Sequence, residues 1–96
     1  MPENKFTIRA SKLDTSTILE PGGKPGDIAT VTFTIGVAPR TWEIPIYVNR
    51  QMFDDQDIIP IARSFFATFV QTLARQTADW KMSDADVDVR KRPPEK

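Results

Sequence analysis

Three aspartates near the end of the chain have the spacing of a calcium-binding loop. Asp84, Asp86 and Asp88 would stand at its first, third and fifth positions, and Glu95 at its twelfth. Such a loop needs a glycine at the sixth position for its sharp turn, and Val89 stands there instead. Two consecutive prolines also interrupt the segment that follows. We therefore expect an acidic segment in contact with solvent and no metal site.

The chain lacks the side chains that most often carry out catalysis. It has neither histidine nor cysteine, which removes the usual general base near neutral pH and any thiolate nucleophile. Asp54, Asp55 and Asp57 supply carboxylates, but they precede a predicted helix and complement the positive end of its dipole. We interpret them as a helix cap formed by Asp55 or Asp57. We expect a protein that is not an enzyme.

A glycine-rich run, EPGGKPGD at residues 20–27, contains a lysine and could suggest a phosphate-binding loop. Such loops connect a strand to a helix, whose N-terminus then holds the phosphate. This run connects two predicted strands, so we interpret it as a flexible connection and predict no cofactor.

Three segments alternate between apolar and polar residues, as half-buried β-strands do. They are residues 5–13, 28–37 and 41–49. The second is the clearest, because a row of threonines lies opposite its apolar residues. Pro45 cannot donate to a strand ladder, so residues 41–49 are expected to form an edge strand or to contain a bulge. A turn at residues 38–40 joins the last two strands, which predicts an antiparallel meander.

The most apolar stretch, residues 58–74, is predicted to form an amphipathic helix that continues to about Trp80. Arg63 and Arg75 leave too short an apolar run for a membrane span, which needs about 20 residues. At about 100° per residue, the apolar residues cover roughly half of the helix circumference. One side is expected to be core: Ile58, Ile61, Phe65, Phe69, Leu73 and Trp80. The edge of the arc holds Ile59, Phe66 and Val70, which either the chain's own loop and tail or a second chain must shield.

The order strand, strand, strand, helix predicts an α+β fold of two layers. A three-stranded antiparallel meander carries one C-terminal helix packed on one face. This single βββα domain is expected to span residues 1–82. Residues 83–96 are expected to be a polar tail, either disordered or forming a short fourth edge strand, because Ala85, Val87 and Val89 alternate with aspartates.

The charge balance bears on partners. Thirteen basic and thirteen acidic residues give a net charge of zero, so nothing pulls the protein strongly to nucleic acid or to an anionic membrane, and no net charge opposes self-association. The first twelve residues contain no apolar signal segment, so we expect a cytoplasmic protein. We predict a small non-catalytic protein that acts by protein–protein contact, as an adaptor, subunit or inhibitor. The first expected partner is a second copy, as a homodimer, bound through Ile59, Phe66 and Val70 at the edge of the helix or through the exposed edge of the sheet.

A nucleic-acid-binding module is the alternative. It would use the polar face of the sheet, where threonine, arginine and tyrosine side chains could contact a duplex. Sheets that bind single strands normally offer several aromatic rings and a basic groove, whereas this face has one aromatic residue. The residues concerned are Arg9, Thr30, Thr32, Thr34 and Tyr47.

Overall fold

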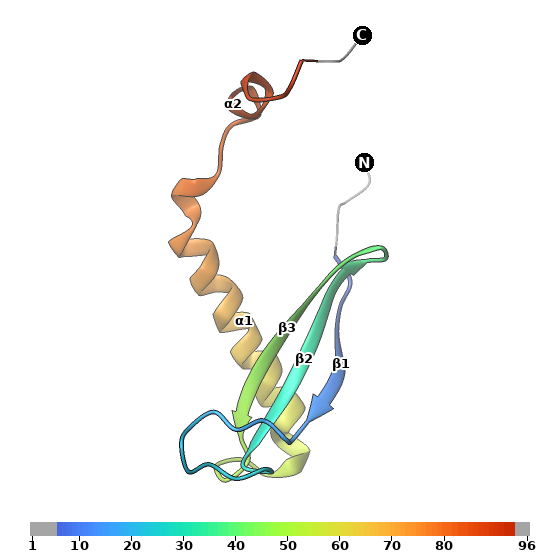
Figure 1. Cartoon of the computed structure of the whole chain (residues 1–96), viewed down its shortest axis with the longest axis vertical. Helices are drawn as coiled ribbons and strands as arrows, with labels where there is room; N and C mark the ends of the chain where they lie inside the picture. Colours follow the sequence, from blue (N-terminus) through green and yellow to red (C-terminus); the bar gives the residue numbers. More distant parts are fainter. Residues whose placement is uncertain (1–5, 94–96) are drawn as a thin grey trace.

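The three predicted strands form one antiparallel sheet in the order β1–β2–β3 (Figure 1). The structure is a computed structural model and describes residues 6–93. Strand β1 is Ile8–Asp14, β2 is Ile28–Val37 and β3 is Arg40–Asn49. The meander is therefore confirmed, and Pro45 lies in an edge strand as predicted.

The cross-strand register places the apolar residues of all three strands on one face. Ile35 of β2 lies between Ile8 of β1 and Trp42 of β3. The register of β1 shifts between Ala10 and Lys12, which leaves the intervening residue as a bulge. Because of this shift, Leu13 lies on the apolar face of the sheet. Strict alternation from Ile8 and Ala10 would have placed it on the polar face.

Only two residues, Ala38 and Pro39, connect β2 to β3, and the peptide bond between them is cis. Gly36 takes a φ of 110° one residue before the strand ends. A Cβ atom at that position would collide with the carbonyl oxygen of Arg40. The tip of the hairpin therefore requires glycine at residue 36.

The predicted helix is α1, Ile58–Gln76, and it follows a 3-10 turn at Asp55–Asp57. Asp57 is the N-cap residue but makes no side-chain capping hydrogen bond, and Asp55 accepts hydrogen bonds from Arg50 instead. The predicted aspartate cap is therefore wrong: an ion pair to the end of β3 holds the carboxylate of Asp55. At the other end, the Thr77 hydroxyl donates to the Leu73 carbonyl at 2.7 Å, and α1 stops before reaching Trp80.

The acidic segment after α1 forms a short helix, α2, Asp84–Val89. The possible short edge strand was therefore wrong for these residues. The Ser83 hydroxyl accepts a hydrogen bond from the Asp86 amide at 3.1 Å, and aspartates in the first turn complement the helix dipole. The capped helix therefore forms here in place of the strand that the alternating pattern suggests. Residues 1–5 and 94–96, which include Glu95 of the calcium-like spacing, lie outside the described residues.

The core forms where the first half of α1 lies on the apolar face of the sheet. Ile58, Ala62 and Phe66 are its buried helix residues, and the ring of Phe66 stacks on that of Phe33 with centroids 4.7 Å apart. From the sheet, the buried partners are Ala29, Val31, Phe33, Ile46 and Val48.

Of the helix residues predicted to be core, Ile58 is buried and Ile61 packs against the core, whereas the later ones are not part of it. Phe65, Phe69 and Leu73 remain 38–42% exposed, and Trp80 is 76% exposed. Phe69 and Leu73 lie on the same side of α1 as the buried Ala62, but beyond the part of the helix that packs on the sheet. At Ala62 the small side chain allows the helix to approach the sheet closely.

The molecule is V-shaped rather than rounded (Figure 1). Its radius of gyration is 18.5 Å and its extents are 58 × 30 × 26 Å, whereas a compact domain of this length would have a radius of gyration of about 12–13 Å. The start of α1 and the loop of residues 15–27 lie at the closed end of the V. The second half of α1 and the tip of the β2–β3 hairpin diverge toward the open end.

Candidate protein-contact surface

The apolar stripe of α1 continues beyond the point where the helix leaves the sheet. Phe69 and Leu73 follow Ala62 and Phe66 at spacings of three and four residues, so all four lie on one side of the helix. Phe69, Val70 and Leu73 are 38–43% exposed. We call these three residues the helix arm. They form the inner surface of one limb of the V, and none of them belongs to the buried core.

The facing limb is also apolar. Trp42, Ile8 and Val37 lie on the sheet face that carries the core, yet they are 54–62% exposed, as is Phe6. The rings of Phe6 and Trp42 pack edge to face with centroids 5.6 Å apart. We call Phe6, Ile8, Val37 and Trp42 the sheet arm. The two arms diverge from the same core (Figure 1).

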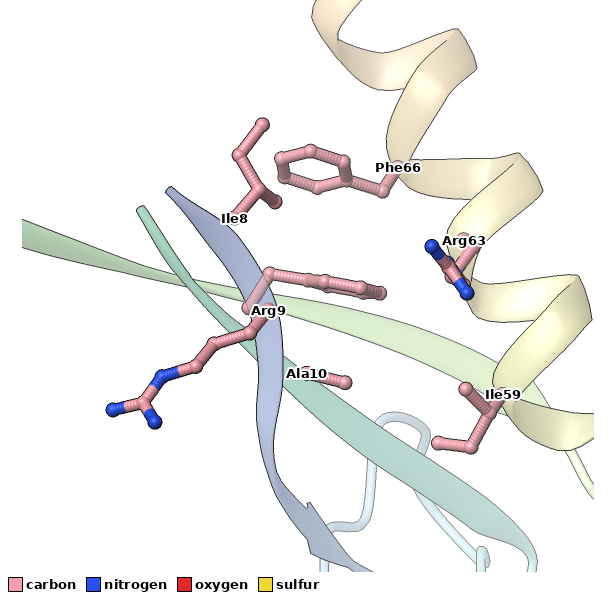
Figure 2. Close-up of a pocket in the computed structure, with 7 residues that line it drawn as sticks. Ile8, Arg9, Ala10, Ile59, Arg63 and Phe66 are labelled. Atoms are coloured by element: carbon pink, nitrogen blue, oxygen red, sulfur yellow. The ribbon is translucent and has the colours of Figure 1, made fainter. Parts of the chain in front are cut away.

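A groove runs between β1 and α1, because α1 lies over β3 and β2 rather than over β1. Its volume is about 460 Å³. Figure 2 shows Ile8 and Phe66 close together at one end of it and Ile59 on the helix at the other. The guanidinium of Arg9 points away from the helix (Figure 2). The lining residues are Ile8, Arg9, Ala10, Phe33, Ile59, Arg63 and Phe66.

The three residues predicted as a partner contact lie on the groove side of the helix. Phe66 is only 8% exposed and half-buried Ile59 packs against the core, so both are shielded mainly within the chain. Val70, one turn beyond Phe66, is exposed. Val70 is covered neither by the loop of residues 15–27, which lies at the closed end, nor by α2, which lies beyond α1 (Figure 1).

The residues of the alternative site share the polar face of the sheet, although they are unequally accessible. Arg9 and Tyr47 are exposed. Thr30 is buried, and its hydroxyl donates to that of Thr17 at 2.9 Å. The hydroxyl of Thr34 lies 2.6 Å from that of Ser11. A hollow of about 260 Å³ lies near the hairpin tip, and Arg9 and Thr34 are among its lining residues.

Residues of the sheet arm and most of the helix arm were absent from the predicted contact. Their alternation and periodicity mark Ile8, Trp42 and Phe69 as inward-facing, and this is where the structure places them. The sequence contains no signal for the angle at which α1 leaves the sheet. Phe69 is accessible because it lies beyond the part of α1 that packs on the sheet, and Ile8 because α1 lies over β2 and β3 rather than over β1.

The chemistry of the groove suits apolar contact. None of its lining residues has a carboxylate, hydroxyl or thiol, and its ionisable groups are two arginines. Within residues 6–93, no three or more acidic, histidine or cysteine side chains are grouped to hold a metal ion. Over the same residues, no helix is long and apolar enough to cross a membrane.

Comparison with known proteins does not assign the chain to a family. No protein-family model matches the chain, and neither does any curated protein or any solved structure.

Proposed function

We propose that this is a non-catalytic cytoplasmic protein that works by protein–protein contact, and that it first associates with a second copy of itself. The observation that carries the proposal is the pair of unpartnered apolar arms on the inner surfaces of the V. Isolated exposed apolar side chains are ordinary, but contiguous exposed patches mark interaction surfaces.

The size of the arms supports a specific interface. Fully enclosed aromatic side chains bury about 150–250 Å² and aliphatic ones about 100 Å², so at their present exposure the arms retain about 500 Å² of apolar surface. A stable interface buries about 800 Å² per partner. Groove residues such as Ala10 and a polar rim can supply the remainder.

The energetics also favour enclosure. At about 25 cal/mol per Å², covering the arms contributes about 12 kcal/mol before the entropic cost of association. The total stability of a domain is about 5–15 kcal/mol. A second copy suits these surfaces because both arms are apolar and the chain has no net charge to oppose its own association.

Size-exclusion chromatography with light scattering tests this function. The protein is expected to elute at twice its monomer mass of 10.9 kDa at micromolar concentration. Phe69→Glu should give a folded monomer, because a carboxylate in the helix arm loses its hydration when the interface forms. Gln71→Glu is the matched control: it introduces the same charge two residues away on the opposite side of α1 and should remain a dimer.

Circular dichroism confirms that each variant is folded. A wild-type monomer at high micromolar concentration would reject self-association. A dimer that survives Phe69→Glu would show that the helix arm is not the contact.

The polar face of the sheet supports a second candidate function, binding to nucleic acid. The supporting observation is the hollow whose lining includes exposed Arg9 together with Thr34 and Thr41. Electrostatic affinity for phosphates is greatest at low salt. A fluorescence anisotropy titration with duplex and single-stranded DNA at low ionic strength should therefore reveal binding, and Arg9→Ala should weaken it. No binding under those conditions ends this candidate.

A further inference from the structure

We infer that the second copy binds by reciprocal exchange of helix ends. The distal half of α1, residues 67–76, of each copy lies in the groove between β1 and α1 of the other. This inference rests on the proposed self-association and specifies how it occurs.

Each chain carries both a donor and an acceptor that cannot meet within it. The donor is the helix arm, and the acceptor is the groove with its uncovered residues Ile8 and Ala10. Because α1 is one continuous helix from Ile58 to Gln76, its distal half cannot fold back into the groove beside its own first half. The two surfaces can meet only between copies, and a twofold arrangement satisfies both at once.

The dimensions of the two surfaces agree. Ten helical residues span about 15 Å, whereas seven strand residues span about 23 Å, so the distal half of α1 fits along β1. The groove is open toward the β1 edge of the sheet, so a second helix can enter from the side without displacing the core.

The groove side of α1 favours close helix packing. The row of residues that starts at Phe66 continues through Val70 to Ala74, and the row that starts at Ile59 reaches Ala67. Ala67 and Ala74 are exposed and small, which permits the interaxial distance of about 8–10 Å found between packed helices. The aliphatic stem of Arg63 can lie along this contact while its guanidinium stays in water.

Twofold exchange makes the two helices antiparallel, with the symmetry axis near Ala67. The C-terminal end of each α1 then lies beside the N-terminal end of the other. Exposed Asp54 and Asp57 precede the N-terminal end, whereas Arg75 and Lys81 lie at or beyond the C-terminal end. The charges and the helix dipoles are therefore complementary in this orientation and repulsive in a parallel one.

Disulfide trapping tests the arrangement, because the chain has no cysteine of its own. Ala10, Ala67 and Leu73 are exposed, so a cysteine at each should leave the fold intact. Ala67→Cys should cross-link to itself under mild oxidation. A mixture of Ala10→Cys and Leu73→Cys should form the mixed disulfide.

The single variants supply the controls. In the antiparallel pair, the two copies of residue 73 lie about 18 Å apart along the helix axis, beyond the roughly 7 Å Cα separation that a disulfide bridges. Leu73→Cys alone should therefore stay reduced, and so should Ala10→Cys alone.

The possible outcomes separate this inference from the proposed function. A dimer in which Leu73→Cys links to itself indicates a parallel helix pair and overturns the exchange. A dimer in which Ala10→Cys links to itself indicates pairing of β1 edges and also overturns it. In both cases self-association stands. A protein that light scattering shows to be a monomer removes both proposals.

Discussion

The two halves of α1 are made of the same kinds of residue but have different surroundings. The first half places Ile58, Ala62 and Phe66 in the core, whereas the second half leaves Phe69 and Leu73 accessible. Both halves have the periodicity of a helix that covers a sheet. This periodicity therefore predicts an amphipathic helix but does not predict what covers its apolar side.

Side-chain size along the stripe explains why the halves diverge. Ala62 adds almost no bulk between helix and sheet and is completely buried. One turn later, the Phe66 ring must fit over the Phe33 ring, with which it stacks. The increase in bulk from Ala62 to the stacked rings of Phe66 and Phe33 separates helix from sheet, and α1 leaves the sheet beyond Phe66.

Truncating one phenylalanine in each half of α1 should give the largest difference in stability between the two halves. Phe66→Ala should lower the free energy of unfolding by about 3–5 kcal/mol, because it removes a buried ring and leaves a cavity. Phe69→Ala should lower it by less than about 1 kcal/mol, because its ring is already partly hydrated in the monomer. Urea denaturation at a concentration low enough to keep both variants monomeric measures the difference.

The same pair of variants has an internal control. If the proposed dimer forms at higher concentration, Phe69→Ala should be more destabilising there, because unfolding is then coupled to loss of the interface. Equal losses for both variants in the dilute monomer would show that the helix arm is packed within the chain in solution.

Much of the fold could be predicted from the sequence because strand periodicity is simple. Alternation assigned Ile8, Ile35 and Trp42 to one face, since side chains on a strand point in only two directions. The helix could not be oriented in the same way. An apolar arc of half the circumference allows several rotations about the axis, and the contact between Ala62 and the sheet that selects one of them is tertiary.

Enlarging one alanine in each half of α1 should give a smaller difference in stability between the two halves. Ala62→Leu should lower the free energy of unfolding by about 1–3 kcal/mol, because three extra carbon atoms have no room between helix and sheet. Ala67→Leu should change it by less than about 0.5 kcal/mol in the dilute monomer, since residue 67 is exposed. Thermal unfolding followed by circular dichroism measures both. A loss of similar size for Ala67→Leu would indicate that the V closes in solution.

The candidate site shows the same limit on prediction. Ile59, Phe66 and Val70 were chosen as the edge of the apolar arc, and they lie on the side of α1 that faces the groove. Their burial differs because Phe66 meets Phe33 whereas Val70 lies beyond the sheet. The sequence pattern places these residues at the edge of the apolar arc but contains no signal for the point along α1 where the core ends.

The smallest expected effect concerns the closed end, where β1 passes into the loop of residues 15–27. Asp14 accepts hydrogen bonds from the Ser16 hydroxyl at 2.7 Å and from the Ser16 amide at 3.2 Å. The side-chain hydrogen bond from Ser16, followed by the backbone one, lowers the pKa of Asp14 below its ordinary value. Because the folded-state pKa is the lower one, this turn stabilises the fold fully above the ordinary pKa, and the contribution is lost as pH falls through the lowered pKa.

A pH titration followed by the NMR signals of the side-chain carboxyl carbons can show whether the turn at Asp14 and Ser16 persists in solution. The Asp14 carboxyl should titrate below the range of an unstructured aspartate, and Ser16→Ala should bring its pKa back toward that range by removing the hydroxyl donor. These hydrogen bonds should then order the loop even though it is exposed. The open end differs, because its exposed surface is apolar. An ordinary pKa for Asp14 in the wild-type protein would mean that the hydrogen bonds from Ser16 to Asp14 do not persist in solution.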